Sequence, residues 1–369
     1  MRILQISSAK TFGGGERHFV DLVRALADRG HEVFAAVRPT SEWLGRLDFL
    51  PPDRLLRVSI RNSFGILSAT RIANFARENQ IEIIHAHVAR DYIPASLASA
   101  MTPQAGFVLT RHLVFPLKPF NRIVLKNLDR AIAVSAGVER GLRKTFDHKK
   151  ITVIPNGIDV QKWAVAERDV LRKDFRLRNA IPMDVPLVGI VGELIANKGQ
   201  NDLIRAAEKL NAERPNTHFI VVGKDHSIGK KYRDALRKQV FESGLAEKFV
   251  WVDWVENTAE LYAAIDVFVS ASHSESFGLA MLEAMAAGTP VVATETAGAR
   301  ELLGNDAILI KAGDAAELAA AIGSKLSDAV AAADEAAFRQ REAAERFSID
   351  RMAEATENVY REVAEGRKK

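Results

Sequence analysis

The residues from 269 to 294, VSASHSESFGLAMLEAMAAGTPVVAT, constrain the fold more than any other stretch of this 369-residue chain. An apolar run ends at Ser270, a polar loop that carries Glu275 follows, and a helix is expected from about Phe277 to Ala287. A Gly-Thr-Pro turn then leads into a second apolar run. Strand, helix and strand in this order predict a βαβ crossover, which belongs to a parallel sheet. We therefore expect an α/β protein.

The loop before this helix also predicts a binding site. In parallel sheets, ligands bind beyond the carboxyl ends of the strands, and the unpaired N–H groups at a helix start attract anions. Glu275 lies just before the helix and Glu283 lies eight positions later. A carboxylate accepts hydrogen bonds from sugar hydroxyls but repels a bare phosphate, so the pattern predicts a ligand that carries both. The alternative is a buried βαβ unit with two solvated glutamates.

Length and composition narrow the protein class. A chain of 369 residues usually forms two domains. Its 51 Lys and Arg against 47 Asp and Glu give a net charge of only +4, which does not indicate a nucleic-acid partner. The lack of cysteine excludes disulfides and thiolate metal sites, and the nine histidines show no spacing typical of zinc sites. The first residues, MRILQISSAK, lack a long apolar run, so we expect a cytoplasmic protein without a signal peptide.

The amino-terminal residues predict a Rossmann-like half. An apolar strand from Arg2 to Ser7 is followed by three glycines at 13–15, a helix from near Glu16 to Gly30, and a second strand. Binding of NAD is disfavoured, because GGGERH lacks the dinucleotide spacing and the second strand ends at 37–38 without an acid for a ribose. The glycine amides are expected to serve a phosphate or an acceptor instead.

Polar residues follow the next three apolar runs. His85 and His87 follow the first run, His112 follows the second, and Ser135 follows the third, so all could line one sheet edge. A single histidine is most often structural, and that interpretation is preferred for His85 and His87. For His112, the position directly after an apolar strand favours a site. The expected strands here are residues 81–85, 106–110, 131–134 and 151–154.

A second half begins after a charged stretch. Residues 157 to 186 are charged and end in two prolines, so we expect an irregular segment at a domain boundary. Lys198 and Gly199 then open a helix, and from Asp314 the chain predicts terminal helices, of which residues 351–361 carry one apolar face for docking. The expected strands of the second half are residues 186–192, 218–222, 249–252, 266–270, 291–294 and 307–310.

Taken together, these motifs resemble the retaining glycosyltransferases of family 4. GGGERHFVDLVRALADRGHEV, IIHAHV, AVSAGV, VIPNGID, VGELIANKGQ, SESFGLAMLEAMAAGTPVVAT and TAGARELL occur in the order of that family and span nearly the whole chain. The resemblance implies the GT-B fold, with two Rossmann-like domains whose parallel sheets face across a cleft. It implies an acceptor-side domain over residues 1–163, a nucleotide-sugar-binding domain over 164–348, and a final helix, 349–369, that returns to the first domain.

The resemblance also implies roles for individual residues. His112, Lys198 and Glu275 would be catalytic: His112 lies near the donor sugar, Lys198 neutralises the departing diphosphate, and Glu275 contacts the transferred sugar. Glu283 would bind the ribose. Backbone amides for the sugar and diphosphate would come from Gly14, Gly15, Phe277, Gly278 and Leu279.

The reaction implied is transfer of a hexose-type unit from a nucleotide-diphosphate sugar to a glycan or glycolipid acceptor, with retention of configuration. The leaving phosphate accepts the acceptor's proton, so no covalent intermediate, metal ion or other cofactor is expected. The sequence agrees in offering no suitably placed DxD pair.

Two residues depart from the family pattern. Glu193 stands where many members have an arginine on the diphosphate, and Asp253 stands where a glycine is frequent. Like charges at contact distance repel, so Glu193 must turn away or leave more of the charge to Lys198. Two alternatives stay open for this reason: a nucleotide-sugar epimerase or hydrolase of the same fold, and a weakly catalytic sugar-nucleotide binder.

The segment from 113 to 126, LVFPLKPFNRIVLK, mixes basic and apolar residues. Family members that act on lipid-linked acceptors contact the bilayer through such surfaces, so peripheral attachment to the inner face of the membrane is one expectation. A helix packed on its own sheet, with its lysines in water, explains the pattern equally well.

Overall fold

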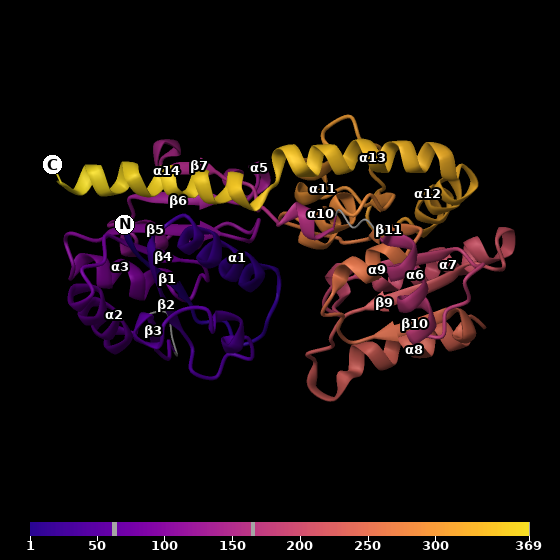
Figure 1. Ribbon diagram of the computed structural model, residues 1–369, viewed down its shortest axis with the longest axis horizontal. Helices are drawn as coiled ribbons and strands as arrows, with labels where there is room; N and C mark the ends of the chain where they lie inside the picture. The colour runs from indigo at the N-terminus through magenta and orange to yellow at the C-terminus, as the bar shows by residue number, and fades with distance from the viewer. Residues whose placement is uncertain (61–64, 164–166, 369) are drawn as a thin grey trace. The chain divides into compact units, whose positions relative to one another are not determined.

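The computed structural model describes residues 1–60, 65–163 and 167–368, and it contains two parallel sheets within an α/β fold (Figure 1). This confirms the predicted fold class. The chain divides into two compact units, Met1–Ile158 with Ile349–Lys369, and Asp159–Ser348. The predicted boundary lies between residues 163 and 164, and residue 164 lies outside the described part of the chain. Trp163 lies in the second unit, where its indole N–H donates to Thr258 Oγ1 at 3.2 Å.

The first unit contains a seven-stranded sheet in the order β3-β2-β1-β4-β5-β6-β7, and every neighbouring pair is parallel. The strand order reverses between β1 and β4, so the carboxyl ends of these two strands flank a topological switch point, where α/β proteins bind ligands. The bounds are β1 Arg2–Ser7, β2 Glu32–Val37, β3 Leu55–Arg57, β4 Ile83–Ala86, β5 Gly106–Arg111, β6 Arg130–Ala133 and β7 Ile151–Val153.

Helices cover both faces of this sheet. α1 and α14 pack on one face, where Phe19 of α1 and Val359 of α14 share a core with Ile3 and Val33. Side chains alternate along a strand, and Phe34 therefore points to the other face, where its ring meets Phe75 of α2 at 5.9 Å. The helices of this unit are α1 Gly14–Asp28, α2 Ile66–Glu78, α3 Tyr92–Ala100, α4 Asn121–Val124, α5 Ala136–Leu142 and α14 Ile349–Lys368.

The final helix lies along the first unit, as its apolar face predicts. Met352, Val359 and Tyr360 are buried, and α14 contacts α1, β4 and β5 (Figure 1). The polar edge of the helix adds an ion pair, in which Arg29 contacts Glu357 at 2.8 Å. The helix therefore closes one face of the first core although its residues are the last in the sequence.

The second unit contains a five-stranded parallel sheet in the order β10-β9-β8-β11-β12. Its order reverses between β8 and β11, which forms a second switch point. The prediction of a strand at 307–310 is wrong, because only one bridge joins Ile310 to Thr294 and no ladder follows. The bounds are β8 Leu187–Val191, β9 His218–Val222, β10 Phe249–Val252, β11 Val267–Ser270 and β12 Val291–Ala293.

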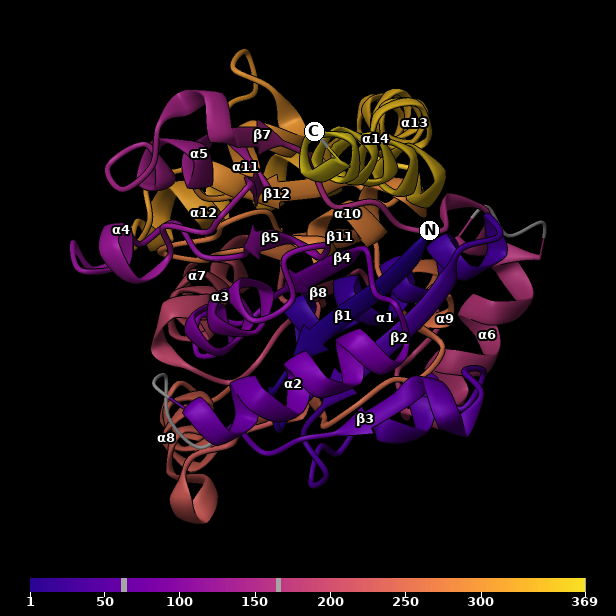
Figure 2. The ribbon, with the colours of Figure 1, turned by 90° about the vertical axis from the view of Figure 1, so that its left-hand side faces the viewer.

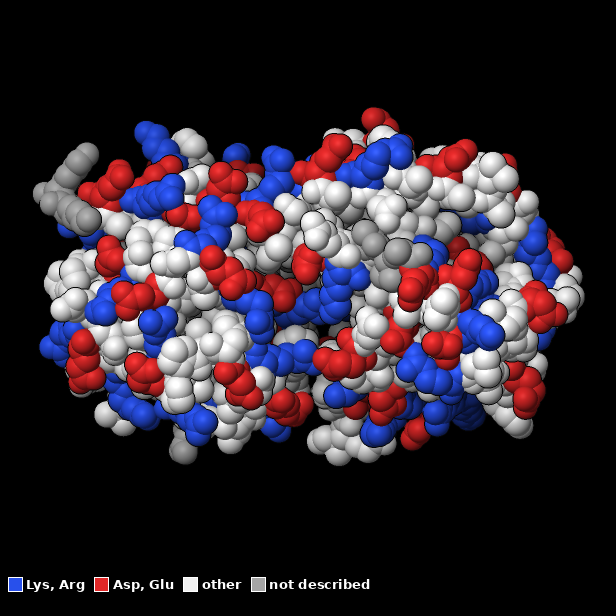
Figure 3. Space-filling model, viewed as in Figure 1, with Lys and Arg blue, Asp and Glu red and all other residues white. Residues whose placement is uncertain are grey.

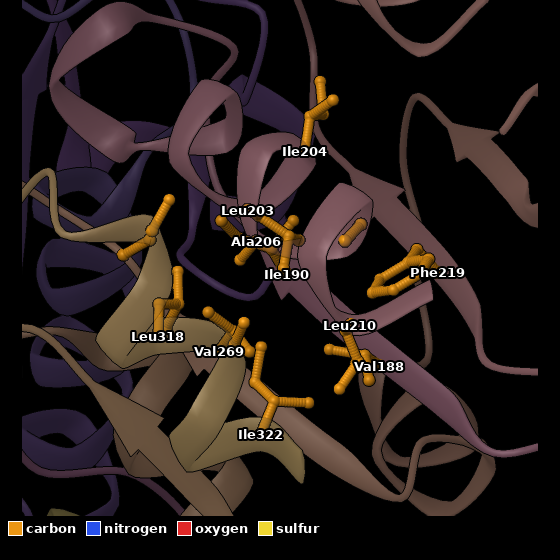
Figure 4. Packing of buried hydrophobic residues seen from close by; sticks show 14 of the residues in the cluster. Val188, Ile190, Leu203, Ile204, Ala206, Leu210, Phe219, Val269, Leu318 and Ile322 are labelled. Carbon is orange, nitrogen blue, oxygen red and sulfur yellow. The ribbon is translucent and has the colours of Figure 1, made fainter. Parts of the chain in front are cut away.

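The core of the second unit lies between this sheet and the helices α7 and α12. Figure 4 shows Leu203 and Leu210 of α7, Leu318 and Ile322 of α12, and Val269 of β11 pointing into one cluster. The helices of this unit are α6 Arg168–Arg178, α7 Gln200–Glu213, α8 Lys231–Glu242, α9 Thr258–Ala264, α10 Leu279–Ala286, α11 Ala297–Leu303, α12 Ala315–Ser327 and α13 Ala329–Arg346.

The charged stretch after residue 157 is not irregular throughout, contrary to the prediction. It contains α6, which packs on α9. The guanidinium of Arg176 is fully buried and donates to the carbonyl oxygens of Ala264 and Val185, at 2.9 and 2.8 Å. It also pairs with Asp266 at 2.9 Å. A helix that is held by buried polar contacts lacks the apolar periodicity by which a helix is predicted from sequence.

A buried carboxylate joins the end of β1 to the start of α3. Asp91 is fully buried, its Oδ2 accepts from the Ser8 N–H at 2.8 Å, and its Oδ1 accepts from the Ser8 hydroxyl. Burial raises the pKa of Asp91 to about 6, against the opposing effect of these hydrogen bonds. Folding therefore favours the protonated carboxyl.

An Asp91→Asn variant tests this. A carboxyl whose pKa is higher in the folded than in the unfolded state contributes stability below the unfolded pKa, near 3.8, and loses it as the pH rises to about 6. Between pH 4.5 and 7.5, the free energy of unfolding of the first unit should fall by about 2 kcal/mol more in the wild type than in the variant. Urea titrations followed by circular dichroism measure this difference, and parallel pH profiles would contradict it.

Candidate functional site

The predicted site residues of the second unit lie at its switch point. β8 and β11 pair directly, with Val188 opposite Val267. The loop after β8 carries Lys198, and the loop after β11 carries Glu275. Because both strands are parallel, both loops leave the same edge of the sheet.

Lys198 and Glu275 form an ion pair, in which Lys198 Nζ lies 2.5 Å from Glu275 Oε2. The other carboxylate oxygen accepts from the Ser276 N–H at 3.2 Å. An ammonium group has three N–H bonds, and this pair uses one of them. Two donors of Lys198 can therefore point at a further anion while Glu275 holds the amine in place.

Backbone contacts fix the two loops to each other. The His273 N–H donates to Asn197 O at 2.8 Å, and the Asn197 side chain donates to Ser274 O at 2.9 Å. His273 Nε2 also lies 2.6 Å from Asp202 Oδ2, on the first turn of α7. The position of Lys198 relative to Glu275 is thus set by contacts on both sides of it.

Gly199 makes this close approach sterically feasible. Its φ is +70°, and a Cβ atom there would lie 2.0 Å from the carbonyl oxygen of Ala271. Only a residue without a side chain fits between the start of α7 and the loop after β11.

The helix after Glu275 begins at Leu279, two residues later than predicted. Gly278 precedes it with a φ of +96°. The first bond of the helical ladder runs from the Leu282 N–H to Gly278 O, so the N–H groups of Leu279 and the next two residues have no partner within the helix. The ring of Phe277 is buried and meets the ring of Phe347 edge-on, with 5.8 Å between the ring centroids.

Glu283 lies one turn into α10 and is buried. The hydroxyl of Tyr262, on α9, lies 3.0 Å from Glu283 Oε2 and 2.9 Å from Ala280 O. Tyr262 therefore orients the carboxylate. The sequence does not indicate this role, since a tyrosine in an apolar helix resembles an ordinary core residue.

The two residues that depart from the family pattern, Glu193 and Asp253, have different surroundings. Glu193 is exposed and has no ion pair within the described part of the chain, so its side chain leaves the Lys198–Glu275 pair undisturbed. Asp253 pairs with Arg233, and Lys230 lies 3.8 Å away. The hydrogen bond from Arg233 lowers the pKa of Asp253 from its ordinary value.

Gly14, Gly15 and His112 belong to the first unit. α1 begins at Gly14, earlier than predicted, so Gly14 and Gly15 offer the free N–H groups of its first turn. A Cβ atom at Gly15 would lie 3.9 Å from His112 Cδ2, so these two residues are neighbours. Burial lowers the pKa of His112 well below its usual value, with a further contribution from His18. The imidazole is therefore neutral at physiological pH.

The structure assembles the predicted residues into two sets. Lys198, Glu275 and Glu283 lie around the start of α10 in the second unit, and His112 lies beside the start of α1 in the first. That the two sets face each other across a cleft stays a prediction. His85 has hydrogen-bond partners at both ring nitrogens, which agrees with a structural role.

Two glycine variants test the close approach at Gly199. Alanine at Gly229, with a φ of +75° and no atom within 4 Å of the added Cβ, meets only the backbone cost of about 1–2 kcal/mol. Gly199→Ala meets the same cost and also collides with Ala271, which should add about 1–3 kcal/mol. Denaturant unfolding of the second unit measures both, and equal losses in the two variants would contradict the steric account.

Both halves of the chain match models of glycosyltransferase families. Residues 12–162 match the model described as Glycosyltransferase Family 4, and residues 172–347 match the model described as Glycosyl transferases group 1. The fold is also that of a protein whose structure has been solved. The chain resembles Anabaena HepE in complex with UDP and glucose, with a TM-score of 0.83 at 24% identity over 97% of this chain and 98% of the other.

Curated relatives cover most of the chain as well. The chain is 28% identical to the lipopolysaccharide core biosynthesis glycosyltransferase LpsE of Rhizobium meliloti (strain 1021), over 86% of each chain. It is 31% identical to the 2-deoxystreptamine N-acetyl-D-glucosaminyltransferase of Streptomyces fradiae, over 86% of this chain and 83% of that one. With the parallel sheets and switch points described above, these matches show that the chain belongs to glycosyltransferase family 4 and has the GT-B fold.

Proposed function

We propose that this glycosyltransferase moves a hexose-type sugar from a nucleoside-diphosphate sugar to a glycan or glycolipid acceptor, with retention of configuration and without a metal ion. The observation that carries the proposal is the arrangement at the second switch point. There a lysine, two carboxylates and the free amides of α10 come together. This set matches a ligand that is anionic at one part and rich in hydroxyls at another.

The donor diphosphate would bind between Lys198 and the start of α10. Lys198 keeps two N–H bonds beyond its pair with Glu275, and the amides from Leu279 onward add the positive end of the helix. These donors stabilise the charge that develops as the sugar leaves. Anabaena HepE, which shares the fold, was solved with UDP and with UDP-glucose, and this supports a nucleotide-sugar donor.

The carboxylates would bind the hydroxyl groups of the donor. Glu283, held by Tyr262, would accept from the ribose hydroxyls, and Glu275 would face the transferred sugar. Because Glu275 is paired with Lys198, it would serve as a positioning group, and we assign it no covalent bond to the sugar. The proton of the acceptor hydroxyl then passes to the leaving phosphate, on the same face as the bond that breaks.

His112 would contact the donor sugar from the first unit. Its burial keeps the imidazole neutral, so the ring can exchange hydrogen bonds with a sugar hydroxyl but does not act as a cationic acid. The neighbouring backbone N–H groups of Gly14 and Gly15 would donate hydrogen bonds to the donor's diphosphate or sugar. In many family members an arginine at the position of Glu193 helps to bind the diphosphate. Glu193 supplies no positive charge, so Lys198 would be the side chain that binds the diphosphate here.

Two substitutions test the donor site. Lys198→Met should lower kcat by about 100- to 1000-fold, because it removes a donor to the departing diphosphate. Glu283→Gln keeps the contact with Tyr262 but loses the charged acceptor, and it should weaken nucleotide binding by about tenfold. Calorimetry with UDP, GDP and ADP measures binding, and donor consumption with an acceptor panel measures transfer.

The controls for these variants are Lys209→Met and Glu213→Gln, both at exposed positions of α7, which should behave as the wild type. If none of the three nucleotides binds the wild type, the proposal fails. Release of free sugar or of an epimer without any acceptor would instead identify a hydrolase or an epimerase. Binding without turnover would identify a sugar-nucleotide binder.

A lipid-linked acceptor would bring the first unit to a membrane surface. No described helix has the length and apolar character needed to cross a bilayer. Over the face in Figure 3, acidic and basic side chains alternate on each unit. Within the segment 113–126, however, Phe115 and Ile123 are 64% and 74% exposed beside exposed Lys118 and Arg122. The helix in this segment, α4, spans only four residues and lies at the periphery of the unit (Figure 2).

The contact can be tested with vesicles. The wild type should sediment with vesicles that contain phosphatidylglycerol, and the double variant Phe115→Ser, Ile123→Ser should bind at least about tenfold more weakly, because it removes two apolar side chains from the contact. Ile308→Ser, at a position 93% exposed in the second unit, is the matched control. Equal sedimentation of all three proteins, or none, would remove membrane contact from the proposal.

A further inference from the structure

Three histidines of the first unit converge at the edge of its sheet. His18 comes from α1, His87 follows β4, and His112 follows β5. One ring nitrogen from each lies within 4.8 Å of one nitrogen of each of the others. The ring centroids of His18 and His112 are 4.7 Å apart, and those of His18 and His87 are 5.4 Å apart.

Four of the six ring nitrogens in this cluster lack hydrogen-bond partners among the described residues. Both ring nitrogens of His18, Nδ1 of His87 and Nε2 of His112 are buried and unpaired. An unpaired buried polar atom costs about 1–3 kcal/mol, and folded proteins rarely leave several in one place. The cluster therefore calls for a ligand that bonds to imidazole nitrogen.

A hydrogen-bond chain fixes which nitrogen His87 presents. The amide nitrogen of Gln5 donates to the Tyr360 hydroxyl at 2.9 Å, so the amide oxygen faces His87 Nε2, 2.7 Å away. An amide oxygen only accepts, so Nε2 carries the proton and Nδ1 carries a lone pair. Metal-binding histidines are commonly oriented in this way, with the second nitrogen donating to a fixed oxygen.

Asn156 is buried beside these rings. Its side chain neighbours His18, and its Oδ1 atom lacks a hydrogen-bond partner among the described residues.

We propose that His18, His87 and His112 form a binding site for a divalent transition-metal ion of the zinc type. Zn–N bonds of about 2.0–2.1 Å place the nitrogens of a tetrahedral site about 3.3 Å apart, so each ring nitrogen needs to move by at most about 1 Å. Three imidazoles leave the fourth position to a water molecule, which could donate to Asn156 Oδ1. Imidazole ligands suit zinc, cobalt, nickel and copper, and disfavour magnesium and calcium.

The consequence for catalysis rests on the proposed function. His112 cannot contact the donor sugar through a nitrogen that is bound to a metal ion, so occupancy of this site is expected to inhibit transfer reversibly. Metal binding itself requires no sugar nucleotide. A failure to bind metal would thus leave the proposed transferase intact, and a failure of transfer would leave the metal site intact.

The test is a cobalt titration of the untagged full chain after dialysis against a chelator. One Co²⁺ per chain should bind and give the strong visible bands of a four-coordinate ion, and Zn²⁺ should displace it. His18→Phe should abolish these bands, whereas His148→Ala, at an exposed histidine outside the cluster, should retain them. A spectrum of hydrated cobalt alone in the wild type, or unchanged bands in His18→Phe, would overturn the proposal.

A second variant protects the test against misfolding of His18→Phe, which circular dichroism would reveal. Gln5→Met keeps the volume of the side chain but removes the oxygen that orients His87. Loss of such a partner commonly weakens metal binding by about 10- to 100-fold. Zn²⁺ affinity by competition calorimetry should fall by that factor, and an affinity equal to the wild type would contradict a site that uses His87.

Discussion

Every chemical feature of this protein depends on the parallel direction of its strands. A parallel sheet needs a crossover after each strand, and every crossover returns the chain to the same starting edge. All carboxyl ends therefore lie together, and each loop that leaves them can supply one polar side chain. In the second unit this brings Lys198 and Glu275, 77 positions apart in the chain, into one ion pair. In the first unit it brings His87 and His112 to the same edge.

The parts of the fold that follow from local patterns could be predicted, and those that depend on buried polar contacts could not. Short apolar runs predicted β1, β9 and β10 with their observed bounds. By contrast, α6 was not predicted. Its Arg176 is buried because the guanidinium donates to backbone carbonyl oxygens, and such contacts do not appear in the apolar pattern of the sequence. The 307–310 segment is apolar enough for a strand, yet only Ile310 pairs with its neighbour, so composition alone overstated the sheet.

The candidate site shows the same division. The two glutamates lie in one local motif and Lys198 was predicted from the family resemblance, and the structure brings Lys198 and Glu275 into contact. Tyr262 and His18 act through contacts with residues distant in the sequence, so no local spacing indicates them. The nine histidines appeared unrelated for this reason. Three of them lie close together only because α1 and the ends of β4 and β5 are neighbours at one edge of the sheet. The spacing of the histidines in the sequence does not indicate this arrangement.

The pair between Lys198 and Glu275 also bears on how an enzyme of the proposed kind would release its products. Without a nearby carboxylate, departure of the diphosphate would leave the ammonium group of Lys198 as an unpaired charge. The cost of that unpaired charge would slow release of the diphosphate. Here a tethered carboxylate already stands 2.5 Å from the amine and substitutes for the outgoing anion. The same carboxylate would oppose the entry of the next nucleotide. Lys198 would thus keep an internal counter-ion both while the diphosphate is bound and after it has left.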